Sequence, residues 1–133
     1  RYLFMKIING ALDIKSKKLN KLTVGSLDYV RDWSYAGDIS KAIYAITNKG
    51  ISNTYVIGSG KGNSIKTVIE IIFDNFDLNF DKYVDVDETL IRKGDPVSIV
   101  SNPKKINNEL RWSNNVSFED LIQICIESKT NKF

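Results

Sequence analysis

The segment VRDWSYAGD, at residues 30–38, places one arginine, two aspartates and two aromatic residues within nine positions. It follows the turn-forming run VGSLD at 24–28 and precedes apolar residues at helical spacing. The chain contains no histidine, the commonest general base and a frequent metal ligand in proteins. A Ser-His or metallohydrolase mechanism therefore cannot be built from these residues, and the function of Arg31 must be sought elsewhere.

The composition predicts one globular domain with a hydrophobic core. The chain has 133 residues, of which 42% are hydrophobic, and a formal net charge of +3. This charge suits small anions better than nucleic acid. Cys125 is the only cysteine, which excludes an intramolecular disulfide and favours a reducing, cytoplasmic location. No apolar run approaches the roughly 20 residues of a membrane-spanning helix, and the amino end lacks a cleavage signature.

The pattern of apolar residues predicts a mixed α/β chain that is mostly helical. Asp38 is placed to cap one helix and Ser64 another, while Asn102 with Pro103 and Ser117 with Asp120 form two further start signals. We expect helices over 2–18, 39–48, 65–75 and 103–110, and one after Ser117.

Three segments have the character of strands. KLTV at 21–24 is short and half apolar, and KYVDVD at 82–87 alternates like a strand with one exposed face. NTYVIG at 53–58 is β-branched and aromatic and ends at a glycine, which predicts a buried strand of a parallel sheet.

Several polar segments allow both a functional and a structural interpretation. The loop GSGKGNS at 58–64 could hold phosphate, but it lacks the dinucleotide and P-loop patterns, so a flexible turn is the simpler interpretation. The lysines at 15, 17, 18 and 21 suit a solvated helix end. The carboxylates at 85–88 alternate in direction and cannot all bind one metal. Trp112 and Phe118 fit a core better than a stacking surface.

Arg31 and Arg92 lie in similar surroundings. Both follow apolar, extended segments, and each has an acidic neighbour, Asp32 for the first and Asp95 for the second. Two guanidinium groups could converge on a diphosphate through charge-assisted hydrogen bonds, while a carboxylate accepts those of a ribose. Ordinary surface ion pairing explains the same spacing.

The chain resembles the carboxyl-terminal part of the GDP-mannose 4,6-dehydratase family, within the extended short-chain dehydrogenase/reductase superfamily. The resemblance runs over nearly the whole chain, and its most specific motif is G-x-L-D-x-x-R-D-W-x-x-A-x-D at 25–38. NTYVIGSGKGNSIKTVIEIIF, RKGDP at 92–96 and SFEDLI follow in the family's order. The implied fold class is α/β, the substrate-binding part of an extended Rossmann-type fold, mostly helical with a few short strands.

The resemblance also implies a division of labour. In the family, an amino-terminal Rossmann half binds NADP and supplies the catalytic Ser/Thr, Glu and Tyr-x-x-x-Lys groups, while the carboxyl-terminal segments close over the nucleotide sugar. Lys6 matches the lysine of the helix that approaches the substrate. Gly25 and Leu27 lie in the segment that packs around the nucleotide.

The family's phosphate and ribose contacts fall on the two arginine loops. Arg31 matches the arginine of the Arg-Asp-Trp motif, and Arg92 matches a second phosphate-binding arginine. Asp95 stands where the family has an acidic ribose partner, although this dehydratase typically has glutamate there. The resemblance therefore implies that both arginines neutralise the diphosphate of a sugar nucleotide.

This chain departs from the family in ways that set further expectations. It has neither the glycine-rich strand-turn-helix motif nor a Tyr-x-x-x-Lys pair, and the usual Thr-Arg-Lys is Phe4-Met5-Lys6. We therefore expect residues 1–133 to be a single substrate-binding portion that contains no catalytic residue, binds no metal and is inactive alone. NADP would be bound by an absent amino-terminal part.

The expected partner is GDP-mannose or a related nucleotide sugar, without nucleic acid or membrane, and the intact enzyme would be a homo-oligomer. The alternatives are a fragment of another nucleotide-sugar epimerase, dehydratase or reductase, or a non-enzymatic anion-binding or interaction domain. The last predicts a self-sufficient fold. An enzyme fragment instead predicts that the strand at 53–58 lacks its neighbouring strands.

Overall fold

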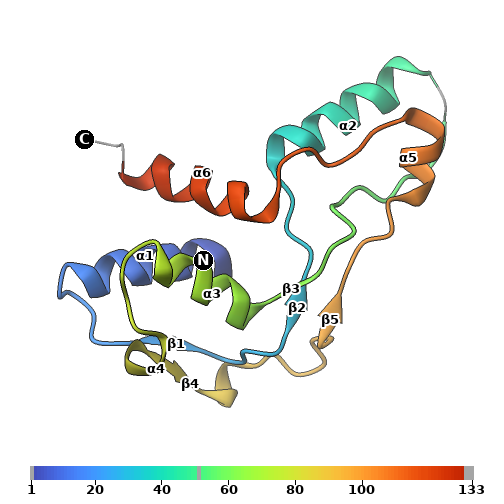
Figure 1. Ribbon diagram of the computed structural model, residues 1–133. Helices are drawn as coiled ribbons and strands as arrows, with labels where there is room; N and C mark the ends of the chain where they lie inside the picture. Colours follow the sequence, from blue (N-terminus) through green and yellow to red (C-terminus); the bar gives the residue numbers. More distant parts are fainter. Residues whose placement is uncertain (1, 51, 131–133) are drawn as a thin grey trace.

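The computed structural model describes residues 2–50 and 52–130 (Figure 1). The helices are α1 (Leu3–Lys15), α2 (Ala36–Asn48), α3 (Ile65–Asp74), α4 (Phe80–Tyr83), α5 (Lys104–Leu110) and α6 (Phe118–Thr130), and η1 (Glu88–Leu90) is a single 3₁₀ turn. The strands are β1 (Leu22–Val24), β2 (Val30–Arg31), β3 (Asn63–Ser64), β4 (Val84–Val86) and β5 (Ser98–Ile99). The chain is thus α/β and mostly helical, as expected.

Two very small sheets join segments that are distant in the sequence. β1 pairs with β4 in parallel, with Leu22 opposite Val84. β2 lies in the centre of the other sheet, antiparallel to β3 and parallel to β5, and Val30 is opposite both Ser64 and Ser98. These ladders are too short to form a layer of the core. The second sheet brings the segments that contain β3 and β5 together around β2.

The main core lies between α1, α3 and α6, with β1 beside them (Figure 1). These helices carry apolar residues every three or four positions, so each buries one face. Fully enclosed side chains include Ile7, Ile8, Ile69, Ile72 and Ile122. Burying each such side chain contributes about 1.5–3 kcal/mol relative to leaving it in water. Residues of α1, β1 and α3 in this core region also line the cavity of the candidate site.

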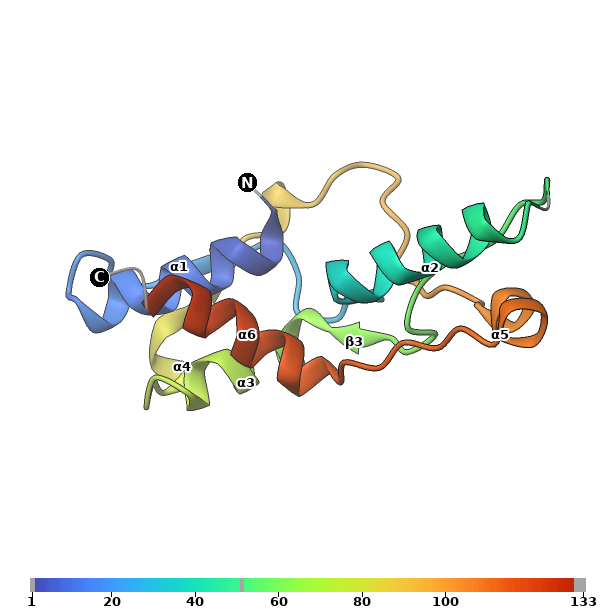
Figure 2. The same cartoon turned by 90° about the horizontal axis from the view of Figure 1, so that it is seen from above.

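A second, smaller cluster lies at the other end of the molecule, between α2 and α5 (Figure 2). Ala42, Ile106 and Trp112 are buried there, and Tyr55 and Ile57 pack against them. Trp112 is a core residue, as expected, and its indole nitrogen donates a hydrogen bond to the backbone oxygen of Asp38 (3.0 Å).

The segment 53–58 is extended but is not a strand, so the expectation of a buried parallel strand was wrong. Within the described residues no other strand lies beside it. Its side chains still alternate: Tyr55 and Ile57 pack against the second cluster, whereas Val56 is 54% exposed. The sequence pattern therefore identified the alternation correctly, but a ladder also needs a partner strand.

The helix start signals were mostly correct. Ser64 accepts a hydrogen bond from the backbone N–H of Thr67, and Ser117 accepts one from that of Asp120 (both 3.0 Å). The side chain of Asn102 accepts from the backbone N–H of Lys104 (3.3 Å). The 82–87 strand shortens to β4, because residues 80–83 form a helical turn.

Asp38 is not a helix cap, which corrects the prediction from the sequence. α2 begins two residues earlier, at Ala36, so Asp38 lies inside its first turn and is fully buried. Its carboxylate accepts hydrogen bonds from the backbone N–H groups of Asn115 and Val116 (both 2.9 Å) and from Lys41 (3.2 Å). Burial alone would raise the pKa of Asp38, but these hydrogen bonds hold it below its ordinary value.

We predict that Asp38→Asn destabilises the fold. Both backbone N–H groups donate to Oδ2, so the asparagine oxygen can accept them only as a neutral acceptor and with its NH₂ group turned toward the ammonium group of Lys41. The expected loss is about 1.5–3 kcal/mol in the free energy of unfolding, measured by urea denaturation. Asp28→Asn removes the same charge from an exposed side chain and should change stability by less than about 0.5 kcal/mol. Equal effects of the two substitutions would contradict the prediction.

The lowered pKa of Asp38 also predicts a pH dependence. A carboxyl group with a depressed native pKa stabilises the fold fully above its unfolded pKa, near 3.8, and this contribution is lost as the pH falls through the native pKa. Between about pH 5 and pH 2, the wild-type protein should therefore lose stability more steeply than Asp38→Asn. Urea denaturation at several pH values measures this, and parallel curves would show that Asp38 does not contribute.

Candidate functional site

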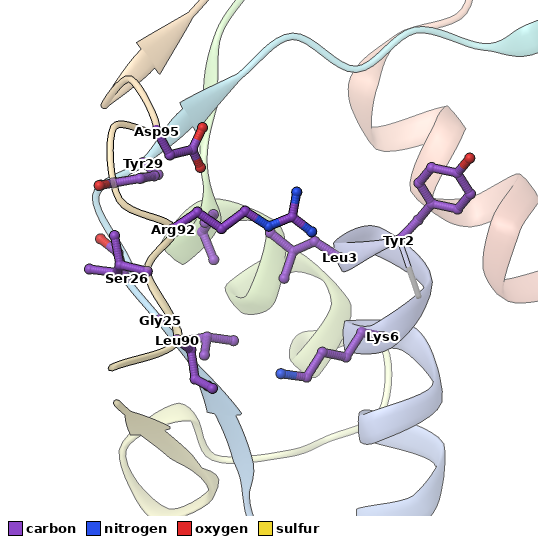
Figure 3. Close-up of a pocket in the computed structure, with 12 residues that line it drawn as sticks. Tyr2, Leu3, Lys6, Gly25, Ser26, Tyr29, Leu90, Arg92 and Asp95 are labelled. Atoms are coloured by element: carbon purple, nitrogen blue, oxygen red, sulfur yellow. The ribbon is translucent and has the colours of Figure 1, made fainter. Parts of the chain in front are cut away.

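A cavity of ≈ 690 Å³ lies between the start of α1, the loop that follows β1 and the segment at 90–95 (Figure 3). Its volume is within the range of roughly 300–1,000 Å³ that is usual for ligand sites. The apolar part of its wall comes from Leu3, Val24, Ile65, Leu90 and Ile91. The polar part contains Lys6, Ser26, Tyr29, Arg92 and Asp95. This combination suits a ligand with both an apolar and an anionic part.

The backbone geometry at Gly25 explains how the 90–95 segment reaches the cavity. β1 pairs with β4, and the backbone N–H of Asp87 donates to Val24 O (2.9 Å) directly before η1. A Cβ atom at Gly25 would lie 3.2 Å from the backbone nitrogen of Ile91 and from the carbonyl carbon of Leu90. Glycine therefore permits the close approach that places Arg92 on the cavity wall.

Among the described residues, two cations line the cavity. Lys6 projects from α1 and donates to the backbone oxygen of Thr23 (2.6 Å). Arg92 extends across the opening, as Figure 3 shows, and within residues 2–50 and 52–130 it makes no ion pair. Its guanidinium group is thus available to an anion that enters the cavity.

Arg31 lies outside the cavity lining, behind its wall. Its Nη2 atom forms an ion pair with Asp95 Oδ2 (3.0 Å), and its Nη1 atom donates to the backbone oxygens of Val30 (2.8 Å) and Val97 (3.3 Å). The guanidinium carbon also lies 5.3 Å from the centre of the Tyr29 ring. Arg31 therefore contacts two residues of the wall, while Arg92 faces the space itself.

The site residues expected from the sequence do not all line the cavity, and Arg31 is one that lies outside the lining. Lys6, Gly25, Arg92 and Asp95 line one cavity. Leu27 does not, because its side chain packs against the core and its backbone oxygen accepts from the N–H of Lys66 (2.9 Å).

Sequence reasoning missed Tyr29 as a residue of the site. It lies between Gly25 and β2, directly before that strand. No motif in the sequence marks this residue, and only the folded chain shows that it lines the cavity.

Asp32 is a structural carboxylate that organises the loop at 58–64. It accepts hydrogen bonds from the backbone N–H groups of Ser59 (3.1 Å), Gly60 (3.0 Å) and Ser101 (3.2 Å), and from both serine hydroxyls. Burial opposes ionisation, but the hydrogen bonds from Ser101 and Ser59 and from the backbone lower the pKa of Asp32. In this loop the backbone N–H groups of Ser59 and Gly60 are therefore bound to a carboxylate and are not free to hold phosphate.

The other candidate segments have ordinary surface contacts. Lys21 pairs with Asp85 (2.8 Å), and Lys15 donates to the backbone oxygen of Phe76 (2.9 Å). Phe118 stacks against Trp33 with ring centres 5.8 Å apart, at the edge of the main core. In the part of the chain that the structure describes, no group of three potential ligands could hold a metal ion, and no helix is long and apolar enough to cross a membrane.

Comparison with known proteins identifies the family. The sequence model of the family described as GDP-mannose 4,6 dehydratase matches residues 1–125. The chain belongs to the GDP-mannose 4,6 dehydratase family. GDP-mannose 4,6 dehydratase 2 of Arabidopsis thaliana is 25% identical over 126 residues, which cover 95% of this chain and 34% of that relative. The dTDP-glucose 4,6-dehydratase of Escherichia coli is 30% identical over 112 residues, covering 77% of this chain and 30% of that relative.

Comparison with solved structures confirms the fold class. The dTDP-glucose 4,6-dehydratase of Bacillus anthracis, solved in complex with NAD, matches with a TM-score of 0.83 at 22% identity. The match covers 98% of this member of the GDP-mannose 4,6 dehydratase family and 39% of the other chain. The α/β fold is thus that of the corresponding part of this NAD-bound dehydratase. The chain spans about a third of the length of the curated relatives that it matches.

We predict that Asp32→Asn releases the loop at 58–64. Loss of the negative charge weakens every hydrogen bond that a backbone N–H group donates to this side chain. The amides of Ser59, Gly60 and Ser101 should therefore exchange with solvent about 10-fold faster or more. Hydrogen–deuterium exchange measures this directly, with Asp28→Asn as the exposed control. Unchanged exchange at these three amides would show that the loop is held by other contacts.

Proposed function

We propose that residues 1–133 form the nucleotide-sugar-binding part of a longer enzyme, a dehydratase or epimerase of the short-chain dehydrogenase/reductase superfamily. The observation that carries this proposal is the cavity in which Arg92, Lys6 and Asp95 face one space. A nucleotide sugar needs cations for its diphosphate and acceptors for its ribose hydroxyls. This wall contains both kinds of group, together with an apolar surface.

Each polar residue of the wall has a proposed role. Arg92 binds the diphosphate through charge-assisted hydrogen bonds, and Asp95 accepts hydrogen bonds from the ribose. Lys6 adds positive charge on the opposite side, from α1. Arg31 orients Asp95 from behind through their ion pair, and direct contact between Arg31 and the diphosphate requires this pair to open. Gly25 and Leu27 shape the segment beside the nucleotide.

The finer proposal is that the substrate is GDP-mannose and that the complete enzyme, acting as a homo-oligomer, converts it to GDP-4-keto-6-deoxymannose with loss of water. This rests on the family match and on the Arg-Asp-Trp motif. NADP, when bound, supplies reversible hydride transfer for such a reaction. The glycine-rich loop fits this cofactor poorly, because the backbone N–H groups of Ser59 and Gly60 already donate to Asp32. We assign NADP and the catalytic groups to the part of the enzyme outside this chain. Residues 1–133 alone would therefore be inactive.

A second candidate is an enzyme for another nucleotide sugar. The observation that favours it is the 30% identity to a dTDP-glucose 4,6-dehydratase, compared with 25% for the Arabidopsis GDP-mannose relative. Binding of GDP-mannose, dTDP-glucose and UDP-galactose to the complete protein separates the candidates. Clear preference for GDP-mannose supports the finer proposal, and preference for another sugar nucleotide overturns it. A protein that binds none of the three is better described as an anion-binding or interaction domain.

We predict that Arg92→Ala weakens substrate binding by the complete enzyme by about 10- to 100-fold, because charge-assisted hydrogen bonds contribute roughly 1.5–3 kcal/mol. Titration calorimetry with the preferred nucleotide sugar measures the dissociation constant. Lys93→Ala is the matched control, since Lys93 is exposed and does not line the cavity. Equal losses in the two variants would indicate general electrostatic attraction rather than a contact made by Arg92.

A further inference from the structure

Tyr29 places an aromatic ring in the polar part of the cavity wall (Figure 3). The residue directly precedes β2, and its backbone oxygen accepts a hydrogen bond from the N–H of Ile65 (3.0 Å), the first residue of α3. Within the described residues, its hydroxyl group makes no hydrogen bond. The residue is therefore anchored through its backbone, and the described residues leave its hydroxyl without a partner.

One side of this ring is occupied by a cation that cannot easily move. The Arg31 guanidinium carbon lies 5.3 Å from the ring centre, a distance at which a cation is attracted to an aromatic face. The same guanidinium is fixed by Asp95 (3.0 Å) and by the backbone oxygen of Val30 (2.8 Å). The side chain of Arg31 is only 21% exposed. The ring is thus backed by a rigid support and is oriented before any ligand arrives.

We propose that the ring of Tyr29 is the stacking surface for the nucleobase of a nucleoside diphosphate. This rests on the proposed function, and it adds the residue that holds the base. A flat, apolar base can cover the ring from the cavity side, opposite Arg31. Stacking on an aromatic side chain tolerates every base, because every base has a π face.

The position of Asp95 indicates which end of the ligand meets the ring. Arg31 contacts both Tyr29 and Asp95, so the ring and the carboxylate are neighbours in the wall. In a nucleoside diphosphate the ribose lies between the base and the diphosphate. If Asp95 binds the ribose and Arg92 binds the diphosphate, the base lies on the side of Asp95 where Tyr29 stands. The hexose then lies beyond the diphosphate, away from Tyr29.

The test is titration calorimetry of the complete protein with GDP, UDP and inorganic pyrophosphate as separate probes. Tyr29→Leu keeps an apolar side chain but removes the ring, and we expect it to bind GDP and UDP about 10-fold more weakly. Tyr29→Phe keeps the ring and should bind both within about twofold of the wild-type affinity. Affinity for pyrophosphate should be unchanged in both variants. Tyr44→Leu, at an exposed position on α2, is the control and should match the wild type.

The remaining outcomes overturn the proposal in distinguishable ways. Equal loss of GDP and pyrophosphate binding in Tyr29→Leu would mean a distorted wall, and equal loss in Tyr29→Phe would mean that the hydroxyl binds the ligand. Unchanged GDP and UDP binding in Tyr29→Leu would exclude stacking and leave the proposed function intact. A loss seen with GDP-mannose but not with GDP would assign the ring to the hexose. Failure of the wild-type protein to bind any nucleoside diphosphate would overturn this inference and the proposed function together.

Discussion

The geometry around β2 depends on the carboxylate of Asp32, which accepts hydrogen bonds from backbone N–H groups of two loops that are distant in the sequence. Asp32 lies 27 residues from Ser59 and 69 residues from Ser101, and it binds the backbone of both. β2, β3 and β5 have only two residues each, so their ladders alone are weak. Hydrogen bonds to an ionised carboxylate are roughly twice as strong as neutral ones. One partly buried carboxylate thus stabilises an arrangement that the short sheet could not maintain.

The candidate site follows from this arrangement. With β5 held beside β2, the segment that contains Asp95 lies against Arg31, and the guanidinium contacts Asp95 and Tyr29 together. On the other side, the close approach at Gly25 places Arg92 on the same wall. The two arginines therefore have different tasks in this structure. Arg92 faces the cavity, and Arg31 fixes the side chains that face it.

Asp38 stabilises the region of the second cluster in the way that Asp32 stabilises the region of the site, by accepting hydrogen bonds from the backbone of a distant segment. It binds the backbone between α5 and α6 and so connects the second cluster to the main core. The extended segment 53–58 runs along this cluster without a strand beside it in the described residues. A lack of neighbouring strands is what the enzyme-fragment proposal predicts for this segment, and the chain matches about a third of the length of the Arabidopsis thaliana and Escherichia coli dehydratases.

Local features could be predicted from the amino-acid sequence: the apolar faces of the helices, the caps at Ser64 and Ser117, and the family through its Arg-Asp-Trp motif. These depend on residues that are close in the chain, so spacing reveals them. The carboxylates that stabilise the fold could be recognised only after folding, because Asp32 and Asp38 obtain their partners from segments dozens of residues away. The tertiary structure also separated Arg31 from Arg92 and brought Tyr29 into the wall. Identical side chains acquire different functions through their neighbours in space, and those neighbours are set by the packing of the whole chain.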